Sequence, residues 1–185
     1  MHARMFEGWS DYFLLVGSAA AALIGLLFVV ATLTVGRELE MVERGQKLYL
    51  TPIVFHLSGI LLLSGLGMAP IVTPLLFGAG NGIVALIGLV SCVRIGWGMH
   101  KLPVAPTKIY DLWWYGIIPA GTYALLVAAA ALLALRPGEP ALTAVAALLM
   151  AQLLVSIHSA WDLVTYLAPR AQDNAAPTAA KKKKP

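Results

Sequence analysis

The sequence has few charged residues for its length. Only 12% of its 185 residues are Asp, Glu, Lys or Arg, whereas soluble domains carry about 25%. Hydrophobic residues make up 59% of the chain, and its mean hydropathy is +0.81. This composition excludes an ordinary soluble domain and predicts an integral membrane protein.

Cysteine is nearly absent, because Cys92 is the only one in the chain. A single cysteine excludes an internal disulfide and a cysteine-based metal cluster. The C-x-x-C-H sequence of c-type haem attachment and the G-x-S-x-G and H-E-x-x-H motifs of hydrolases are also missing. We therefore expect no metal site and no cofactor, and the sequence argues against an enzyme.

Long apolar segments dominate the chain. The first has 24 residues without a charge, about 36 Å as a helix, which is enough to cross a hydrocarbon core of about 30 Å. The Gly-rich sequence FGAGNG at 77–82 predicts a tight turn, and Pro169 is expected to end the last helix. The predicted fold is an all-α integral membrane protein, a five-helix bundle in one domain of residues 1–170. Its spans are about 12–35, 50–77, 83–99, 112–135 and 141–168, and residues 171–185 are a disordered basic tail.

Positive charges flank the apolar segments unevenly. Five spans with the N-terminus outside place ten Lys and Arg residues on the cytoplasmic side and only Arg4 and Arg136 outside. This bias predicts a cytoplasmic C-terminus in a bacterial inner membrane. The net charge of +4 thus reflects orientation in the bilayer rather than a nucleic-acid partner. We expect anionic lipid headgroups near the terminal lysines, Lys181, Lys182, Lys183 and Lys184.

Small residues recur at four-residue intervals in three of the predicted helices. In lipid, such ridges let two helix backbones approach closely. They predict helix contacts within or between subunits, and with them a homo-oligomer. The residues are Gly17, Ala21, Gly25, Gly88, Gly96, Gly116, Ala120 and Ala124.

The last apolar segment carries an unusual polar stretch, QLLVSIHSAWDLVTY at 152–166. Helical geometry gathers Gln152, Ser159 and their polar neighbours on about half of the circumference, and places His158 one turn from Asp162. Ionisable groups inside a membrane helix cost free energy, so they indicate a functional site.

Two further ionisable residues lie at a similar predicted depth. Arg94 and Asp162 each lie about six residues, or about 9 Å, from the cytoplasmic ends of their helices, and His56 and His158 lie about six to ten residues in. The sequence therefore predicts a buried Arg94–Asp162 ion pair with His158 beside it. Structural alternatives are that Arg94 extends to the headgroups and that the two histidines are helix-contact residues.

Three functions fit this cluster. The first is a channel- or transporter-like role, in which a His–Asp pair binds or relays a proton or small ion. The second is a non-catalytic assembly or regulatory subunit that uses the small-residue ridges. The third is a membrane cytochrome with His56 and His158 as axial ligands of a b-type haem. We rank them in this order.

The orientation makes a testable prediction. A cysteine introduced as Gly138→Cys in a Cys92→Ala background should react with a membrane-impermeant thiol reagent added to intact cells. Labelling of position 138 only after the cells are opened would reverse the predicted topology.

Overall fold

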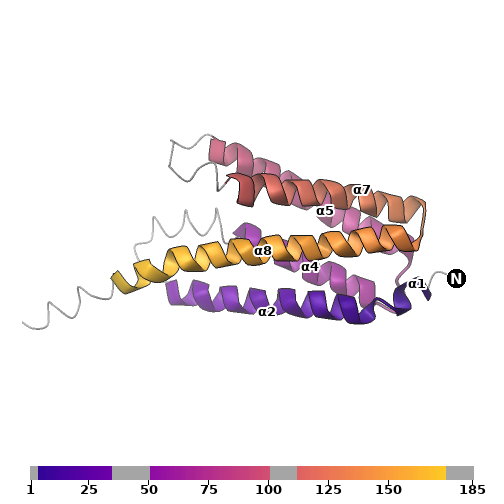
Figure 1. The fold of residues 1–185 in the computed structure, drawn as a ribbon, viewed down its shortest axis with the longest axis horizontal. Coiled ribbons are helices and arrows are strands. Elements are labelled where there is room, and N and C mark those ends of the chain that lie inside the picture. The colour runs from indigo at the N-terminus through magenta and orange to yellow at the C-terminus, as the bar shows by residue number, and fades with distance from the viewer. Residues whose placement is uncertain (1–3, 35–50, 101–111, 174–185) are drawn as a thin grey trace, which may run out of the picture.

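A computed structural model of the chain describes residues 4–34, 51–100 and 112–173, which are helical apart from short connections and contain no strand. A short helix, α1, precedes the first long one, and a π-helical turn, η2, precedes the fourth. The elements are α1 (Arg4–Glu7), α2 (Ser10–Thr34), α4 (Thr51–Met68), α5 (Pro74–His100), η2 (Trp113–Ile117), α7 (Ile118–Leu135) and α8 (Glu139–Asp173) (Figure 1).

Five of the described helical segments are long and apolar enough to cross a membrane, as the sequence predicts. Their outward faces carry large exposed apolar side chains, among them Leu15, Phe28, Leu62, Ile83 and Leu125. Such faces suit lipid, where apolar side chains need no partner. The sidedness of the bundle stays a prediction.

The long helices form a ring that is crossed by the packing of α4 on α8. Around the ring, α2 packs on α4, α4 on α5, α5 on α7, α7 on α8, and α8 back on α2. The cross-contact joins α4 to α8 and divides the ring into a three-helix part and a four-helix part. In Figure 1, α2 lies along one edge of the bundle and α5 and α7 along the other. The interior of the four-helix part is therefore bounded by α4, α5, α7 and α8.

The second and third spans meet earlier in the chain than the sequence predicts. The helix α4 ends at Met68 and α5 begins at Pro74, so the predicted turn at 77–82 is wrong. Proline fits the first turn of a helix, and the Thr73 hydroxyl caps α5 by accepting a hydrogen bond from the backbone N–H of Leu76 at 3.2 Å. The break thus lies at the two prolines, 70 and 74, and the glycines that follow are helical.

Those glycines serve close packing instead of a turn. A Cβ at Gly78 would lie 2.8 Å from the backbone oxygen of Ala130 on α7, and one at Gly80 would lie 2.6 Å from the Leu66 side chain on α4. Small residues let helices approach closely where no hydrophobic effect drives them together. The Gly-rich sequence therefore fixes the α5–α7 contact.

The fourth span begins with a π-helical turn that the sequence does not reveal. The Ile118 N–H bonds to the Trp113 carbonyl, five residues back, and Pro119 follows. Proline has no N–H for the carbonyl four residues earlier, and its ring crowds that carbonyl. The wider turn relieves this conflict, and such turns are frequent at functional sites.

The far end of the fifth span is also longer than predicted. The helix α8 continues past Pro169 to Asp173, since a proline removes one hydrogen bond without necessarily ending a helix. Residues 171–173, which were expected in the tail, are thus helical. The remaining tail with its four lysines, and the charged segments at 35–50 and 101–111, lie outside the described residues.

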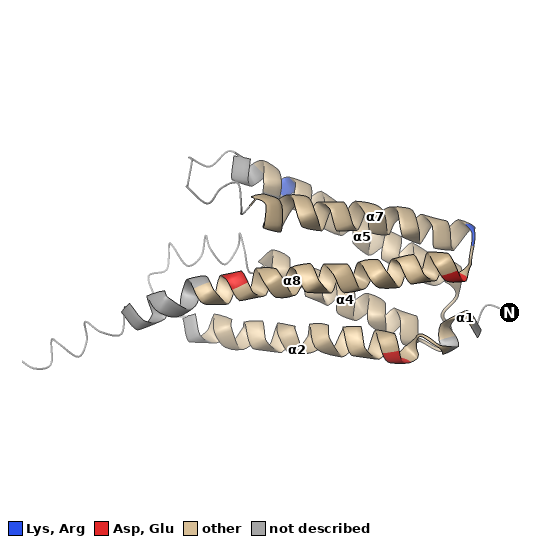
Figure 2. Cartoon of the chain, viewed as in Figure 1, with Lys and Arg blue, Asp and Glu red and all other residues tan. Residues whose placement is uncertain are grey.

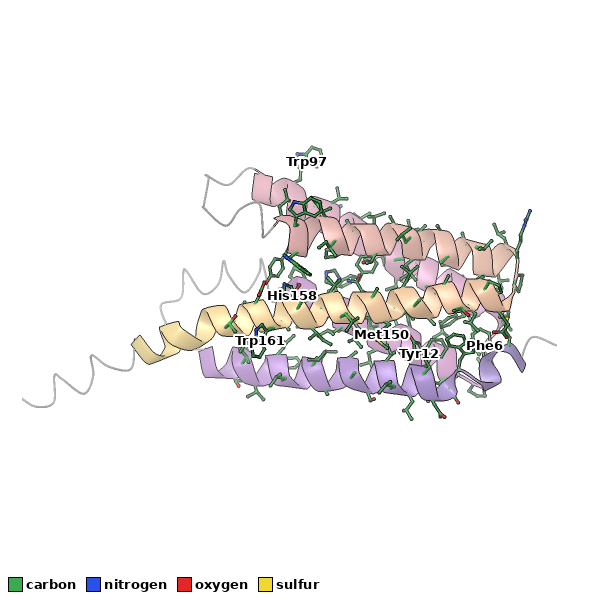
Figure 3. All side chains as sticks on the ribbon, in the orientation of Figure 1. Phe6, Tyr12, Trp97, Met150, His158 and Trp161 are labelled. Atoms are coloured by element: carbon green, nitrogen blue, oxygen red, sulfur yellow. The ribbon has the colours of Figure 1, made fainter. Side chains whose placement is uncertain are left out.

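Exposed tryptophans mark one end of the bundle. Trp97 on α5, Trp113 in η2 and Trp161 on α8 are all more than half exposed, and Figure 3 shows Trp97 pointing away from the bundle at that end. Tryptophan favours the membrane–water interface. This end corresponds to the predicted cytoplasmic side.

The close α5–α7 contact makes a stability prediction. Gly78→Ala should lower the free energy of unfolding by about 1–3 kcal/mol, because the new methyl group meets backbone rather than a movable side chain. Gly82→Ala is the matched control one turn later, where the Cβ would lie 3.9 Å from Ala130. Equal thermal unfolding of both variants in detergent would contradict the packing role of Gly78.

Candidate functional site

The buried histidine of α4, His56, is held by a residue that the sequence did not single out. On α4, the His56 Nδ1 lies 2.7 Å from the Tyr123 hydroxyl of α7, in a hydrogen bond that is fully inside the bundle. His56 is 5% exposed and Tyr123 is 2% exposed. The Tyr123 ring lies against Gly88 of α5, where a Cβ would come within 2.4 Å of the ring. Gly88 therefore makes the space through which Tyr123 reaches His56.

The neighbouring residue on α7 makes a second polar contact, to α8. The Thr122 hydroxyl lies 2.8 Å from the Pro119 carbonyl and also contacts the side-chain amide of Gln152. The other end of this amide, Nε2, has no hydrogen-bond partner among the described residues, although Gln152 is 2% exposed. Turning the amide over exchanges its ends, so in either orientation one polar end is buried without a partner. Such a group costs about 1–3 kcal/mol.

These two contacts form one polar layer across the bundle, consisting of His56, Tyr123, Thr122 and Gln152. Thr122 and Tyr123 are adjacent in the chain, and they bond to α8 and α4 respectively. The layer lies about 20 Å along these helices from the end at the 69–73 and 136–138 connections. We refer to these four residues as the central layer.

Further polar groups continue along the buried face of α8. Ser156 and Ser159 are 1% and 4% exposed, and with Gln152 they repeat at the spacing of one helix face. Ser156 donates to the Gln152 carbonyl of its own helix at 2.9 Å. The Tyr115 hydroxyl donates to the Ser159 carbonyl at 3.2 Å. The predicted polar face of α8 thus points inward over these residues.

The His–Asp pair lies at the end of this face. The His158 Nε2 is 3.6 Å from an Asp162 carboxylate oxygen, and both side chains are about one-third exposed. The Trp114 ring covers the imidazole, with ring centroids 3.7 Å apart. Figure 3 shows His158 between α8 and the start of the fourth span. The predicted stacking of His158 over Asp162 is therefore present, in a site that is partly open.

The predicted Arg94–Asp162 ion pair is wrong. Arg94 is exposed on α5, and the ion pair that Asp162 forms among the described residues is with His158 of its own helix. Arg94 lies on α5 and Asp162 on α8. Equal depth alone does not bring two side chains together, because the rotation of each helix decides the face on which they lie.

The small-residue ridges divide into contact and outward positions. A Cβ at Gly17 would lie 2.9 Å from Ser64 of α4, and a Cβ at Gly116 would lie 3.9 Å from the Cα of Gly96 on α5. Ala120 packs partly buried against the core. Ala21, Gly25 and Ala124 are exposed. The outward positions are open to another subunit, and the homo-oligomer stays a prediction that the mass of the detergent-solubilised protein would test.

Tyr123, Thr122 and Asn81 were missed by the sequence analysis. Asn81 is fully buried on α5, donates to the Phe77 carbonyl at 2.8 Å, and leaves its own side-chain oxygen without a partner among the described residues. The position of Tyr123 in the sequence could have identified it. Tyrosines of membrane helices favour the interface, whereas Tyr123 lies near the middle of its span, where its hydroxyl needs a buried partner.

Few of the described side chains are of a type that could bind a metal ion or a haem. Within the described ranges, no group of three or more His, Cys, Asp or Glu side chains is arranged to hold a metal ion. His56 and His158 lie on helices that pack together, but each ring already has an aromatic neighbour, Tyr123 or Trp114. The haem hypothesis remains a prediction, which a Soret band in the purified protein would support.

The His56–Tyr123 bond makes a prediction about coupling. His56→Leu and Tyr123→Phe should each destabilise the protein, and the double variant should be less destabilised than the sum by about 1 kcal/mol, because either single change leaves a buried polar group alone. Arg94→Gln combined with Asp162→Asn is the matched control and should be additive. Thermal unfolding of seven purified proteins, the shared parent, four single variants and two double variants, measures both cycles. Additivity at His56 and Tyr123 would contradict the coupling.

Comparison with known proteins gives no relative from which a role can be transferred. No family model, no curated protein sequence and no solved structure matches the chain. The function must therefore be inferred from the site itself.

Proposed function

We propose that this chain is a membrane channel or transporter that carries a proton or small ion through the polar interior bounded by α4, α5, α7 and α8. The observation that carries this proposal is the central layer. Buried polar groups in a membrane bundle cost free energy unless they are paired, and unpaired ones indicate a pathway or binding site. Gln152 has such an unpaired end in the middle of the bundle.

The groups on either side of the central layer support a pathway rather than an isolated contact. Toward the end at the 69–73 connection, Asn81 has another buried polar atom without a partner among the described residues, its side-chain oxygen, about 10 Å along α5 from Pro74. Toward the other end, Ser156 and Ser159 lead to His158 and Asp162. The last two side chains are partly exposed, so they are suited to exchange a proton or ion with the water at that surface.

The pathway is tested by replacing the unpaired side chain with an apolar one of similar size. Gln152→Leu should lower the rate of proton or cation flux into proteoliposomes by about tenfold or more, because it removes a buried polar group on the path. Thr143→Val is the matched control on α8, since Thr143 is exposed and its hydroxyl bonds to its own helix.

Both variants are reconstituted at equal protein content after their folding is checked by thermal unfolding. A Gln152→Leu protein that is folded and conducts as fast as the parent would contradict a pathway through the central layer. Absence of any flux in the parent protein would contradict the proposed function itself.

A further inference from the structure

The packing of the central layer also limits what can pass through it. We infer that the transported species is a proton, and that His56 and Tyr123 relay it between α4 and α7. This inference rests on the proposed function and narrows it to one substrate class.

The first reason is space. The Tyr123 ring fills the gap between α5 and α4. Only glycine at position 88 leaves room for the ring, because a Cβ there would lie 2.4 Å from it. His56 and Tyr123 are themselves almost completely buried. A hydrated cation therefore cannot pass between the Tyr123 ring and α5, whereas a proton crosses a hydrogen bond without displacing its heavy atoms.

The second reason is the set of ligands. Hard cations are bound by six or more oxygen atoms, commonly including carboxylates. The central layer holds an imidazole, two hydroxyl groups and one amide, and no carboxylate lies in it. The acidic side chains described are at or toward the helix ends (Figure 2): Asp11, Glu139 and Asp162. A dehydrated metal cation would thus lack compensation at this depth, where an unpaired charge is costly.

The third reason is that the pair has the chemistry of a relay. Imidazole has two ring nitrogens, one a donor and the other an acceptor when neutral, and a phenol both donates and accepts. When the phenol donates to Nδ1, the ring N–H is on Nε2. Transfer of the phenol proton to Nδ1, with transfer of the Nε2 proton to a water molecule on the pathway, leaves the imidazole neutral with its N–H on Nδ1. A second water molecule gives the phenol oxygen a new proton, and exchange of protons with water returns the imidazole N–H to Nε2 before the next transfer.

One proton therefore enters at Tyr123 and one leaves at His56, or the reverse, and neither side chain changes its net charge over the cycle. The hydrogen bond of 2.7 Å between them is short enough for this transfer. The adjacent Thr122 and Gln152 supply further hydroxyl and amide groups to the same layer.

The relay is tested with Tyr123→Phe, which removes the hydroxyl and keeps the ring that fills the space beside Gly88. Tyr12→Phe is the matched control. The Tyr12 hydroxyl also spans two helices, donating at 2.6 Å to the Ala146 carbonyl of α8, but Tyr12 lies on α2, outside the four-helix part. The full chain is reconstituted with a pH-sensitive dye inside the vesicles, and a potassium gradient with valinomycin supplies the driving potential.

Tyr123→Phe should lower proton influx by about tenfold or more, and Tyr12→Phe should leave it within about twofold of the parent. A parallel assay with a sodium-sensitive dye should show no sodium flux in any of the three proteins. Thermal unfolding of each protein in detergent confirms that the variants are folded.

Proton influx that survives in folded Tyr123→Phe would overturn the relay. Sodium flux without proton flux in the parent would overturn the inference about the species and leave the proposed function in place. A parent protein that moves neither ion would overturn both. If Tyr123→Phe does not fold, His56→Gln replaces it under the same criteria.

Discussion

The interior of this bundle depends on one hydrogen bond, between Tyr123 and His56. Membrane helices gain little from burying apolar surface against one another, so specific contacts decide how they associate. Tyr123 begins on α7, crosses α5 at Gly88 and ends on α4. One side chain thus fixes the relative positions of three helices, and it does so only because the residue at position 88 has no side chain.

The fourth span amplifies this arrangement through neighbouring residues. Tyr123 bonds toward α4, while Thr122 contacts Gln152 on α8. About two turns earlier, the π-helical segment before Pro119 directs Trp114 to His158 and the Tyr115 hydroxyl to Ser159. All of these contacts join the fourth span to α4 or α8, the two helices of the cross-contact. The position of the fourth span against α4 and α8 therefore determines how the polar groups of the interior are arranged.

Charge plays a smaller part in the interior than the sequence suggested. Arg94 lies on the outer surface of α5, and His158 and Asp162 lie where the bundle begins to open. The deeper groups are hydroxyl, amide and imidazole, which hydrogen-bond without requiring a counter-ion. This separation, with charges at the surface and neutral groups inside, avoids the cost of an isolated ion in lipid, and it is the arrangement from which proton transfer was inferred.

The sequence alone predicted five helices long and apolar enough to cross a membrane, because low charge and long apolar segments follow directly from the demands of a bilayer. It also identified His56, Gln152, Ser159, His158 and Asp162, since polar residues stand out in apolar helices. Tertiary structure decided the rest. Prolines, rather than glycines, separate α4 from α5; rotation of the helices keeps Arg94 from Asp162; and Gly88 admits Tyr123. Such outcomes depend on which faces meet, and helical periodicity within one segment does not specify its neighbour.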